Sequence, residues 1–319
     1  LYKQNTFQML LMSGEIERLG NLLEEQRIES LFLKGPILAS ELYSDISLRT
    51  CNDIDLLIPQ RELGKMDALL KENGYVKDDY IQTILGDWKW RHHHVAYYNY
   101  EKGIKLEVHW RLNPGPSKEP SFYELWKRKR KCSLFSSPVY YLGREDLFYF
   151  LVTHGARHGW SRLRWLVDIS QLLKQEISIK QTNKLMRKYK ILHLCGQAVI
   201  LASQLIGTEL KGEEIRQLVT GNRPKKLAQD ALFYIKQMIN LHSEPLPIEV
   251  SKYHKYHLFS LMSFHHKILF ILSFLYPYPE DAITLPLPKK VHFLYFPLRP
   301  ILWAWRRVRK FAFTQEDIK

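Results

Sequence analysis

The chain has 319 residues, enough for two domains with hydrophobic cores of their own. Its content of 45% hydrophobic and 25% charged residues is ordinary for a globular protein. Lys and Arg outnumber Asp and Glu by 47 to 33, and the resulting charge of +14 favours phosphate-bearing partners without requiring nucleic acid. The three cysteines lack paired spacing, which argues against a disulfide framework and against a zinc site built from cysteine.

The first residues have the pattern of an amphipathic helix, whereas a signal peptide has a basic region followed by an apolar block. The longest apolar run, residues 268–276, is too short to span a bilayer. These features predict a cytoplasmic protein.

The first half of the chain alternates between helix and strand patterns. In chain order, we expect a helix to about Arg27, a strand at 30–34, a helix from Pro36, a strand at 53–58, a helix at 62–71, and strands at 92–100 and 104–112. Residues 101–103 have the composition of the hairpin turn between the last two strands. The patterns predict a small mixed sheet with helices packed on it.

Residues 113–120 have the composition of a linker, and a short strand pair is expected within 133–142. The remaining patterns are helical, at 145–158, 161–174, 178–189, 193–206, 224–241 and 253–275. The predicted fold class is therefore α+β. A catalytic domain with an N-terminal helix is expected over residues 1–115, followed by a mostly helical domain over 116–319.

Asp53 and Asp55 lie one position apart in Asn-Asp-Ile-Asp-Leu-Leu-Ile. Alternate residues of a strand point to the same face, so the two carboxylates are expected to project together. Adjacent carboxylates repel each other and are tolerated mainly where a cation lies between them. Hard oxygen ligands of this kind suit Mg²⁺ or Mn²⁺.

The strand at 104–112 offers a third carboxylate, because its alternation places Lys105, Glu107 and His109 on one face. If this strand lies beside the one that carries the two aspartates, Glu107 completes a cluster suited to metal-assisted phosphoryl transfer. The alternative is that Glu107 is a solvated residue of an edge strand. His109 is a candidate base, or a group that orients the acceptor.

Lys34 and Gly35 lie between a strand and a helix start. Glycine allows a sharp turn close to a ligand, and the helix that follows directs free N–H groups at the same point. Lys34 would add a cation for triphosphate oxygens. Arg49 either neutralises a phosphate or pairs structurally with Asp53.

A second group of residues lies in Thr-His-Gly-Ala-Arg-His-Gly-Trp-Ser-Arg, residues 153–162. His154 and His158 are four positions apart on a helix and therefore share a face. With Trp160 and Arg162 they are the predicted acceptor-binding residues. For Trp165 and Asp168 the alternative is an inter-helix packing core, in which an arginine or a helix N-terminus holds the buried Asp168.

Four segments carry a family resemblance: Leu-Lys-Gly-Pro, Asn-Asp-Ile-Asp-Leu-Leu-Ile, Leu-Glu-Val-His-Trp and His-Gly-Ala-Arg-His-Gly-Trp. They resemble the bacterial "uncharacterised nucleotidyltransferase" family of the polymerase-β-like superfamily, over most of the chain. The resemblance implies the superfamily's catalytic fold, with Asp53, Asp55 and Glu107 as the metal ligands. The chain departs from the superfamily at Gly35-Pro36, where Gly-Ser or Gly-Gly is usual and a hydroxyl can reach a phosphate.

Members of this family look like tailoring enzymes for peptide natural products, including lasso peptides. The resemblance therefore implies transfer of a nucleotidyl group from an NTP to a hydroxyl or phosphate of an acceptor, such as a phosphorylated ribosomal peptide. One alternative is transfer of a sugar or other group from a nucleotide-activated donor. Another is a non-catalytic binding module that retains the fold. No nucleic-acid template is expected, because no template-binding motif is present.

The C-terminal segment is basic and aromatic. Residues 285–315 contain seven Lys or Arg residues, no Asp or Glu, and the aromatic residues Trp303, Trp305, Phe311 and Phe313. This composition is compatible with peripheral membrane contact, with a face for an anionic acceptor, or with a solvated cap on the helical domain.

Overall fold

The computed structural model describes residues 2–81, 86, 88–175, 177–210, 212–241 and 245–316. Its chain forms two compact units. The larger unit comprises Leu1–Asp78, His94–Asn113 and Lys118–Ser263. The smaller comprises Asp79–His93, Pro114–Ser117 and Phe264–Lys319.

A seven-stranded mixed sheet lies in the larger unit, with strand order β3-β4-β5-β2-β1-β7-β6. The strands are β1 (Leu31–Phe32), β2 (Ile54–Leu57), β3 (Val76–Lys77), β4 (His94–Asn99), β5 (Ile104–His109), β6 (Arg130–Lys131) and β7 (Tyr140–Tyr141). Two pairs are parallel, β2 with β5 and β1 with β7, and the other pairs are antiparallel. The central position of β2 and β5 is what brings the predicted carboxylates to one place in the sheet.

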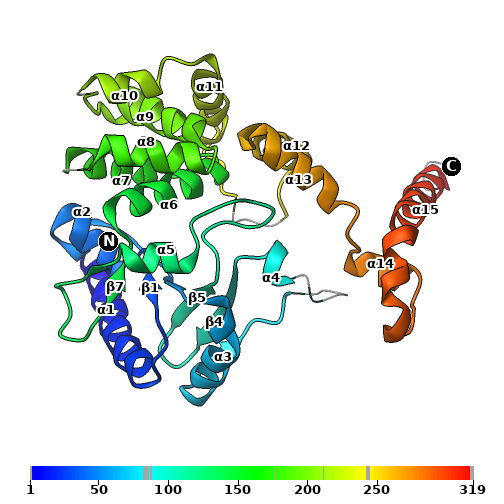
Figure 1. Ribbon diagram of the computed structural model, residues 1–319, viewed down its shortest axis with the longest axis horizontal. Helices are drawn as coiled ribbons and strands as arrows, with labels where there is room; N and C mark the ends of the chain where they lie inside the picture. The colour runs from blue at the N-terminus through cyan, green and yellow to red at the C-terminus, as the bar shows by residue number, and fades with distance from the viewer. Residues whose placement is uncertain are drawn as a thin grey trace. The chain divides into compact units, whose positions relative to one another are not determined.

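Helices cover this sheet and continue beyond it. Those of the larger unit are α1 (Tyr2–Glu25), α2 (Pro36–Tyr43), η1 (Ile46–Leu48), η2 (Gln60–Glu62), α3 (Leu63–Glu72), α5 (Phe122–Lys127), α6 (Arg144–Arg157), α7 (Leu163–Lys174), α8 (Ile179–Lys188), α9 (Leu192–Ile206), α10 (Glu213–Leu218), α11 (Asn222–Lys236) and α12 (Ile248–Leu261). In Figure 1 the green helices from α6 to α11 stack beside one another, with α6 nearest the sheet.

One hydrophobic core joins the sheet to these helices. Leu31 and Leu57, from neighbouring strands, belong to the same buried cluster as Phe148, Leu151 and other residues of α6. Ten of the eleven residues of α6 from Asp146 to Ala156 are buried, and the exception is His154. Such a helix is enclosed on all sides, so α6 is held against the sheet by packing over its whole length.

The fold class predicted from the sequence is confirmed: a small mixed sheet with helices, followed by a helical region. The helix predicted at 253–275 is wrong as a single element, because α12 ends at Leu261 and α13 (Phe264–Ser273) begins after a break. At that break, Arg223 Nη2 donates to the carbonyls of Ser260 and Met262, at 3.0 and 2.7 Å. The division into domains at residues 115 and 116 stays a prediction.

The smaller unit contains α4 (Trp88–Arg91), α13, α14 (Pro279–Thr284), η3 (Lys289–Leu294) and α15 (Tyr295–Glu316). Arg91 and Arg299 lie over the ring of Tyr278, at 4.2 and 4.4 Å from its centroid. Asp281 is fully buried, and its Oδ1 forms ion pairs with Arg299 Nη1 at 2.9 Å and with Arg306 Nη2 at 2.7 Å. Within the described ranges, no helix is both long and apolar enough to cross a membrane.

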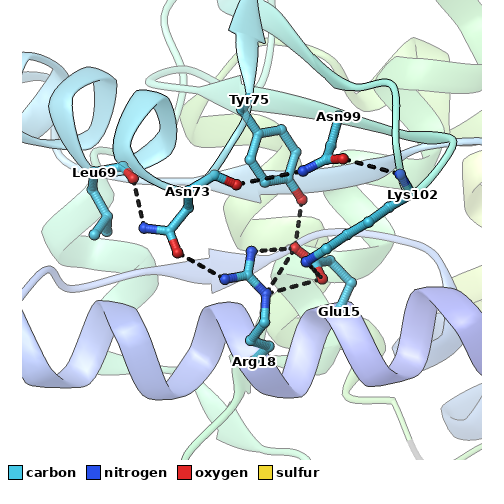
Figure 2. A network of polar contacts seen from close by, with 7 residues as sticks. All are labelled: Glu15, Arg18, Leu69, Asn73, Tyr75, Asn99 and Lys102. Atoms are coloured by element: carbon cyan, nitrogen blue, oxygen red, sulfur yellow. Dashed lines mark hydrogen bonds and ion pairs between the residues drawn. The ribbon is translucent and has the colours of Figure 1, made fainter.

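A polar network ties α1 to the β4–β5 hairpin (Figure 2). Glu15, on α1, is buried and accepts from Arg18 Nε at 3.0 Å, Tyr75 Oη at 2.7 Å and Lys102 Nζ at 2.8 Å. Arg18 also donates to Asn73 Oδ1 at 2.8 Å. Burial alone would raise the pKa of Glu15, but the hydrogen bonds from Arg18, Lys102 and Tyr75 hold it below its ordinary value.

We expect Glu15→Gln to destabilise the protein near neutral pH by ~2 kcal/mol, because it removes the charge that Arg18 and Lys102 share. A lowered pKa in the folded state gives stability that is present above the ordinary value of 4.5 and is lost as the pH falls through the folded-state pKa. Thermal unfolding followed by circular dichroism should therefore show the wild-type advantage shrinking below pH 4.5. An advantage that does not depend on pH would contradict this account.

Candidate active site

The register of two parallel strands brings the predicted carboxylates together. Asp55 on β2 pairs directly with Glu107 on β5, and Leu57 pairs with His109. Paired residues on neighbouring strands point to the same face of a sheet, so Asp55, Glu107 and His109 share one face. The apolar residues that alternate with them on β5, including Leu106 and Val108, are fully buried on the other face.

His109 lies between the two carboxylates. Its Nε2 is 3.2 Å from Asp55 Oδ1 and 3.5 Å from Glu107 Oε2. Glu107 is further held by Lys105, whose Nζ lies 2.6 Å from Oε1. From the neighbouring strand β4, His94 Nε2 lies 3.8 Å from Glu107 Oε2, and its ring centroid is 4.9 Å from that of His109. The predicted face of Lys105, Glu107 and His109 is therefore present, with His94 added to it.

Lys34 and Gly35 form the turn between β1 and α2. Lys34 Nζ lies 3.0 Å from Asp55 Oδ1, so the ammonium is held by a carboxylate of the cluster. Gly35 is the residue before the first turn of α2 and has φ +80°. A Cβ at this position would make only an ordinary contact with Cys51 Sγ, at 3.9 Å, so the left-handed backbone is the reason for glycine here.

The charges of the site act on one another strongly. Burial would raise the pKa of Asp55, but Lys34 and His109 outweigh it and the pKa lies below its ordinary value. Burial and the charge of Asp55 raise the pKa of Asp53. Burial would lower the pKa of His109, but its hydrogen bonds to Asp55 and Glu107 raise it. Burial and the charge of His109 lower the pKa of His94 to about 3.

Among the described residues that belong wholly to the larger unit, one set of potential metal-ligand atoms is close enough together to hold an ion. One atom each of Asp55, Glu107 and His109 lies within 4.8 Å of the others. Asp55 is fully buried, and its Oδ2 has no hydrogen-bond partner among the described residues. Asp53 lies outside this set and is half-buried just before β2, where its carbonyl accepts from Cys51 Sγ at 3.0 Å. The residues present fit a divalent cation, because a buried carboxylate oxygen without a donor is a typical ligand.

Helix α6 packs beside the sheet face that carries the carboxylates and forms a second side of the candidate site. Phe150, His154 and Arg157 recur at spacings of four and three and therefore share one face of the helix. Lys34 Nζ lies 5.9 Å from the centroid of the Phe150 ring. Burial and then the charge of Lys34 lower the pKa of His154 well below its ordinary value. His154 is therefore close enough to Lys34 for the two charges to interact, and its role in acceptor binding stays a prediction.

His158 extends this side of the site, with its ring centroid 4.7 Å from that of His154 and 5.5 Å from that of Trp165. Arg162 lies over Trp165 at 5.7 Å and lines a separate cavity of about 340 Å³ together with Leu163. Trp160 is different, because its side chain is fully buried. A Cβ on Gly155 would come within 2.3 Å of the Trp160 ring, so this tryptophan packs in the core, where an acceptor does not reach it.

Arg49 pairs with Asp168 and not with Asp53. Its guanidinium is buried and contacts Asp168 on α7, with Nε 3.0 Å from Oδ1 and Nη2 3.0 Å from Oδ2. Tyr43 Oη donates to the same Oδ1 at 2.8 Å. The expected pairing with Asp53 is therefore wrong, and the expectation that an arginine holds a buried Asp168 is confirmed. This double contact fixes the loop before β2 onto the helices.

Sequence reasoning assigned no role in the site to His94 or Arg157. His94 belongs to a run of three histidines, and the signal missed was its place opposite His109 in the hairpin. Arg157 stands within the quoted His-Gly-Ala-Arg-His motif, one turn beyond His154. Burial lowers the pKa of Arg157 to about 10, although the charge of Glu107 opposes this shift. Its spacing from Phe150 on the helix was the available signal.

Comparison with known proteins identifies a family for the chain. A search of curated proteins finds no match. Among solved structures, the chain is similar to the solution structure of the antibiotic-resistance factor ANT(2'')-Ia, with 11% identity and a TM-score of 0.40, over 58% of this chain and 92% of that one. The family model described as "Uncharacterised nucleotidyltransferase" matches residues 1–207. The chain belongs to this uncharacterised nucleotidyltransferase family.

Proposed function

We propose that the protein is a metal-dependent transferase that moves a nucleotidyl group from an NTP to a hydroxyl or phosphate of an anionic acceptor. The observation that carries the proposal is the parallel register of Asp55 with Glu107, with Lys34 3.0 Å from Asp55. Two carboxylates and an ammonium at one point of a sheet face suit both a divalent cation and a phosphate chain. Membership in the nucleotidyltransferase family supports the same reaction class.

Asp53, Asp55 and Glu107 are the proposed metal ligands, with Mg²⁺ or Mn²⁺ as the cation. Asp55 Oδ2, which is buried and has no hydrogen-bond partner among the described residues, supports this assignment. The short distance between the carboxylates of Asp55 and Glu107 supports it as well. When bound, the cation would supply Lewis-acid stabilisation of the charge on the phosphoryl oxygens. Asp53 is proposed as a further ligand because its carboxyl is close enough to Asp55 for the Asp55 charge to raise the Asp53 pKa.

Lys34 and Gly35 are proposed to bind the triphosphate. The positive φ of Gly35 lets the backbone turn directly into α2, where free N–H groups gather. Asp55 holds the Lys34 ammonium at this turn, with Nζ 3.0 Å from Oδ1. Arg49 is no longer proposed as a phosphate ligand, because its donors are committed to Asp168.

His109 is proposed to position the carboxylates, in place of the role as a base. It is buried, and its Nε2 faces both Asp55 and Glu107. A group held between two carboxylates fixes their orientation but offers little access to an acceptor. His109→Asn should therefore weaken metal binding together with turnover.

The acceptor is proposed to lie against the face of α6 that carries His154, together with His158, the residue directly after the helix. Arg157 on the same face adds a cation, and the charge of +14 also favours an anionic acceptor. A phosphorylated ribosomal peptide, such as a lasso peptide, fits this chemistry. Arg162 is proposed to contact the acceptor as well, whereas Trp160 is buried in the core and does not.

The proposal is tested by calorimetric titration of the wild-type chain with each common NTP, in the presence of Mg²⁺ and then of a chelator. Binding that requires the metal supports the proposal, and absence of binding to every NTP would contradict it. Mass spectrometry of a candidate acceptor peptide then identifies the group transferred. Addition of a nucleotide monophosphate supports the proposal, addition of a sugar supports the alternative donor, and no addition despite binding supports the non-catalytic module.

Lys34→Ala should weaken binding of a non-hydrolysable NTP roughly ten- to a hundredfold, the effect of losing one charge-assisted contact. The remaining binding should depend less on salt, since an ammonium–phosphate contact is screened by ions. Calorimetry at two salt concentrations measures both effects. Lys225→Ala, at an exposed lysine of α11, is the matched control. Equal affinities for wild type and Lys34→Ala would show that Lys34 serves only to hold Asp55.

A further inference from the structure

The outward face of α15 is apolar. Ile301, Ala304, Trp305 and Val308 recur at helical spacings of three, one and three and therefore lie along one side of the helix. The exposed fractions of Ile301, Trp305 and Val308 are 63%, 56% and 69%. We call these four residues the C-terminal apolar face. Large apolar side chains exposed together mark a surface that binds a partner or a membrane.

The opposite side of α15 fixes this orientation within the smaller unit. Tyr295 and Leu302 are buried, and Tyr295 Oη donates to the carbonyl of Leu285 at 2.8 Å. The ion pairs of Arg299 and Arg306 with Asp281 join α15 to α14, which lies beside it in Figure 1. Because these contacts use the inward side of the helix, the apolar side chains cannot turn inward without breaking a buried ion pair.

The segment that carries the C-terminal apolar face is rich in cations, and of these Arg299 and Arg306 pair with Asp281. Residues 285–315 contain seven Lys or Arg residues and no Asp or Glu. Lys289 and Lys290 are exposed at the start of η3, and neither is ion-paired to a described carboxylate. Arg307 is exposed and lies 5.1 Å from the centroid of the Trp303 ring. Arg and Lys next to exposed Trp are typical of segments at a membrane surface.

Helix α13, in the same unit, also exposes apolar side chains while polar ones are buried. Phe264, Ile268 and Ile271 recur at spacings of four and three and are exposed, while His266 and Ser273 are buried. In a soluble helix the apolar stripe normally faces the core. The smaller unit therefore presents apolar side chains outward from two of its helices.

The charges decide which occupant fits the C-terminal apolar face. In a twofold dimer the same patch would meet itself, so the cations of one copy would face those of the other. A protein partner would bury lysines, which are depleted from the cores of protein interfaces. An anionic lipid surface accepts apolar side chains at the level of the acyl chains and neutralises the cations at the level of the headgroups.

We propose that the smaller unit binds the surface of anionic phospholipid bilayers through the C-terminal apolar face, with Lys289, Lys290 and Arg307 at the headgroups. This binding requires no nucleotide and is independent of the proposed transfer reaction. It would hold the protein at a membrane surface. Phe311 and Phe313, grouped with this segment in the sequence, lie outside the described side chains.

The test is sedimentation of the full chain with phosphatidylcholine vesicles and with mixed phosphatidylcholine–phosphatidylserine vesicles. We expect the wild type to sediment with the mixed vesicles only. The double substitution Ile301→Glu with Val308→Glu should abolish this binding, because it places two carboxylates against acyl chains and headgroup phosphates. Ile248→Glu is the matched control, since Ile248 is 74% exposed in the larger unit, and it should bind like the wild type.

A second variant tests the cations without altering the apolar face. Lys289→Gln with Lys290→Gln should weaken binding roughly fivefold for each lysine, and raised salt should weaken wild-type binding as well. The proposal is overturned if the wild type does not bind the mixed vesicles, or if the Ile301→Glu with Val308→Glu variant binds them equally well. It is also overturned if light scattering without vesicles shows a wild-type dimer that this double substitution dissociates, because a second copy would then cover the face.

Discussion

Asp55→Asn is expected to reduce nucleotidyl transfer by on the order of a thousandfold, because the carboxylate between the proposed cation and Lys34 is lost. Asp53→Asn is expected to do the same. Steady-state rates at saturating NTP and Mg²⁺ measure both effects, and calorimetry with Mn²⁺ reports the accompanying loss of metal affinity. Asp79→Asn, at an exposed residue, is the matched control and should leave the rate unchanged. Turnover near the wild-type rate in either site variant would remove the proposed metal site.

The two substitutions should differ in their effect on stability in the presence of a chelator. Asp55 Oδ1 lies within 3.2 Å of both Lys34 and His109, so its amide variant loses two attractions and should unfold at a lower temperature. Burial and the neighbouring charge of Asp55 disfavour the ionised form of Asp53, so Asp53→Asn should raise the unfolding temperature. The sequence alone suggested relief of repulsion in both cases. Equal shifts for the two variants would contradict the assigned ion pairs.

Asp168→Ala is expected to destabilise the protein by about 3–5 kcal/mol, since it leaves the Arg49 guanidinium buried without its counter-charge. Arg49 is 4% exposed and Asp168 is fully buried. Urea unfolding followed by tryptophan fluorescence measures the loss. The double substitution Arg49→Met with Asp168→Leu should recover most of it, because removing both charges also removes the cost of burying one alone.

An exposed ion pair provides the comparison for this buried one. Lys188 Nζ lies 2.5 Å from Glu124 Oε1, but the two side chains are 57% and 37% exposed. Lys188→Ala should therefore cost less than about 1 kcal/mol. If Asp168→Ala costs no more than Lys188→Ala, the contact between Arg49 and Asp168 does not anchor the loop before β2.

Local patterns were sufficient to predict the elements of the site. The alternation of apolar residues in β5 predicted one face for Lys105, Glu107 and His109, and their side-chain contacts bear this out. The positions of β1, β2 and the start of α2 were also predicted to within a few residues. These predictions succeed because strand and helix periodicity depend on residues close together in the chain.

Partners distant in the chain were not predictable in the same way. Arg49 had a carboxylate four positions away in Asp53, yet it pairs with Asp168, 119 positions along the chain. The predicted helix 253–275 shows no interruption in its apolar pattern. In the structure, the side chains of Arg223 and His193 form hydrogen bonds with backbone carbonyls of residues 260–262, where α12 ends. Trp160 is of a residue type that often binds ligands, but its side chain is buried in the core and packs against Gly155.

By itself, the sequence determined the α+β fold class, the strands that carry Asp55 and Glu107, and the turn at Gly35. Each of these follows from short-range spacing or from the backbone freedom of one residue. Only the tertiary structure decided that β2 and β5 pair in parallel with Asp55 opposite Glu107, and that α6 packs beside them. Many strand pairings and ion pairs were compatible with the same local pattern, and the shared core selects among them by burying one combination of faces.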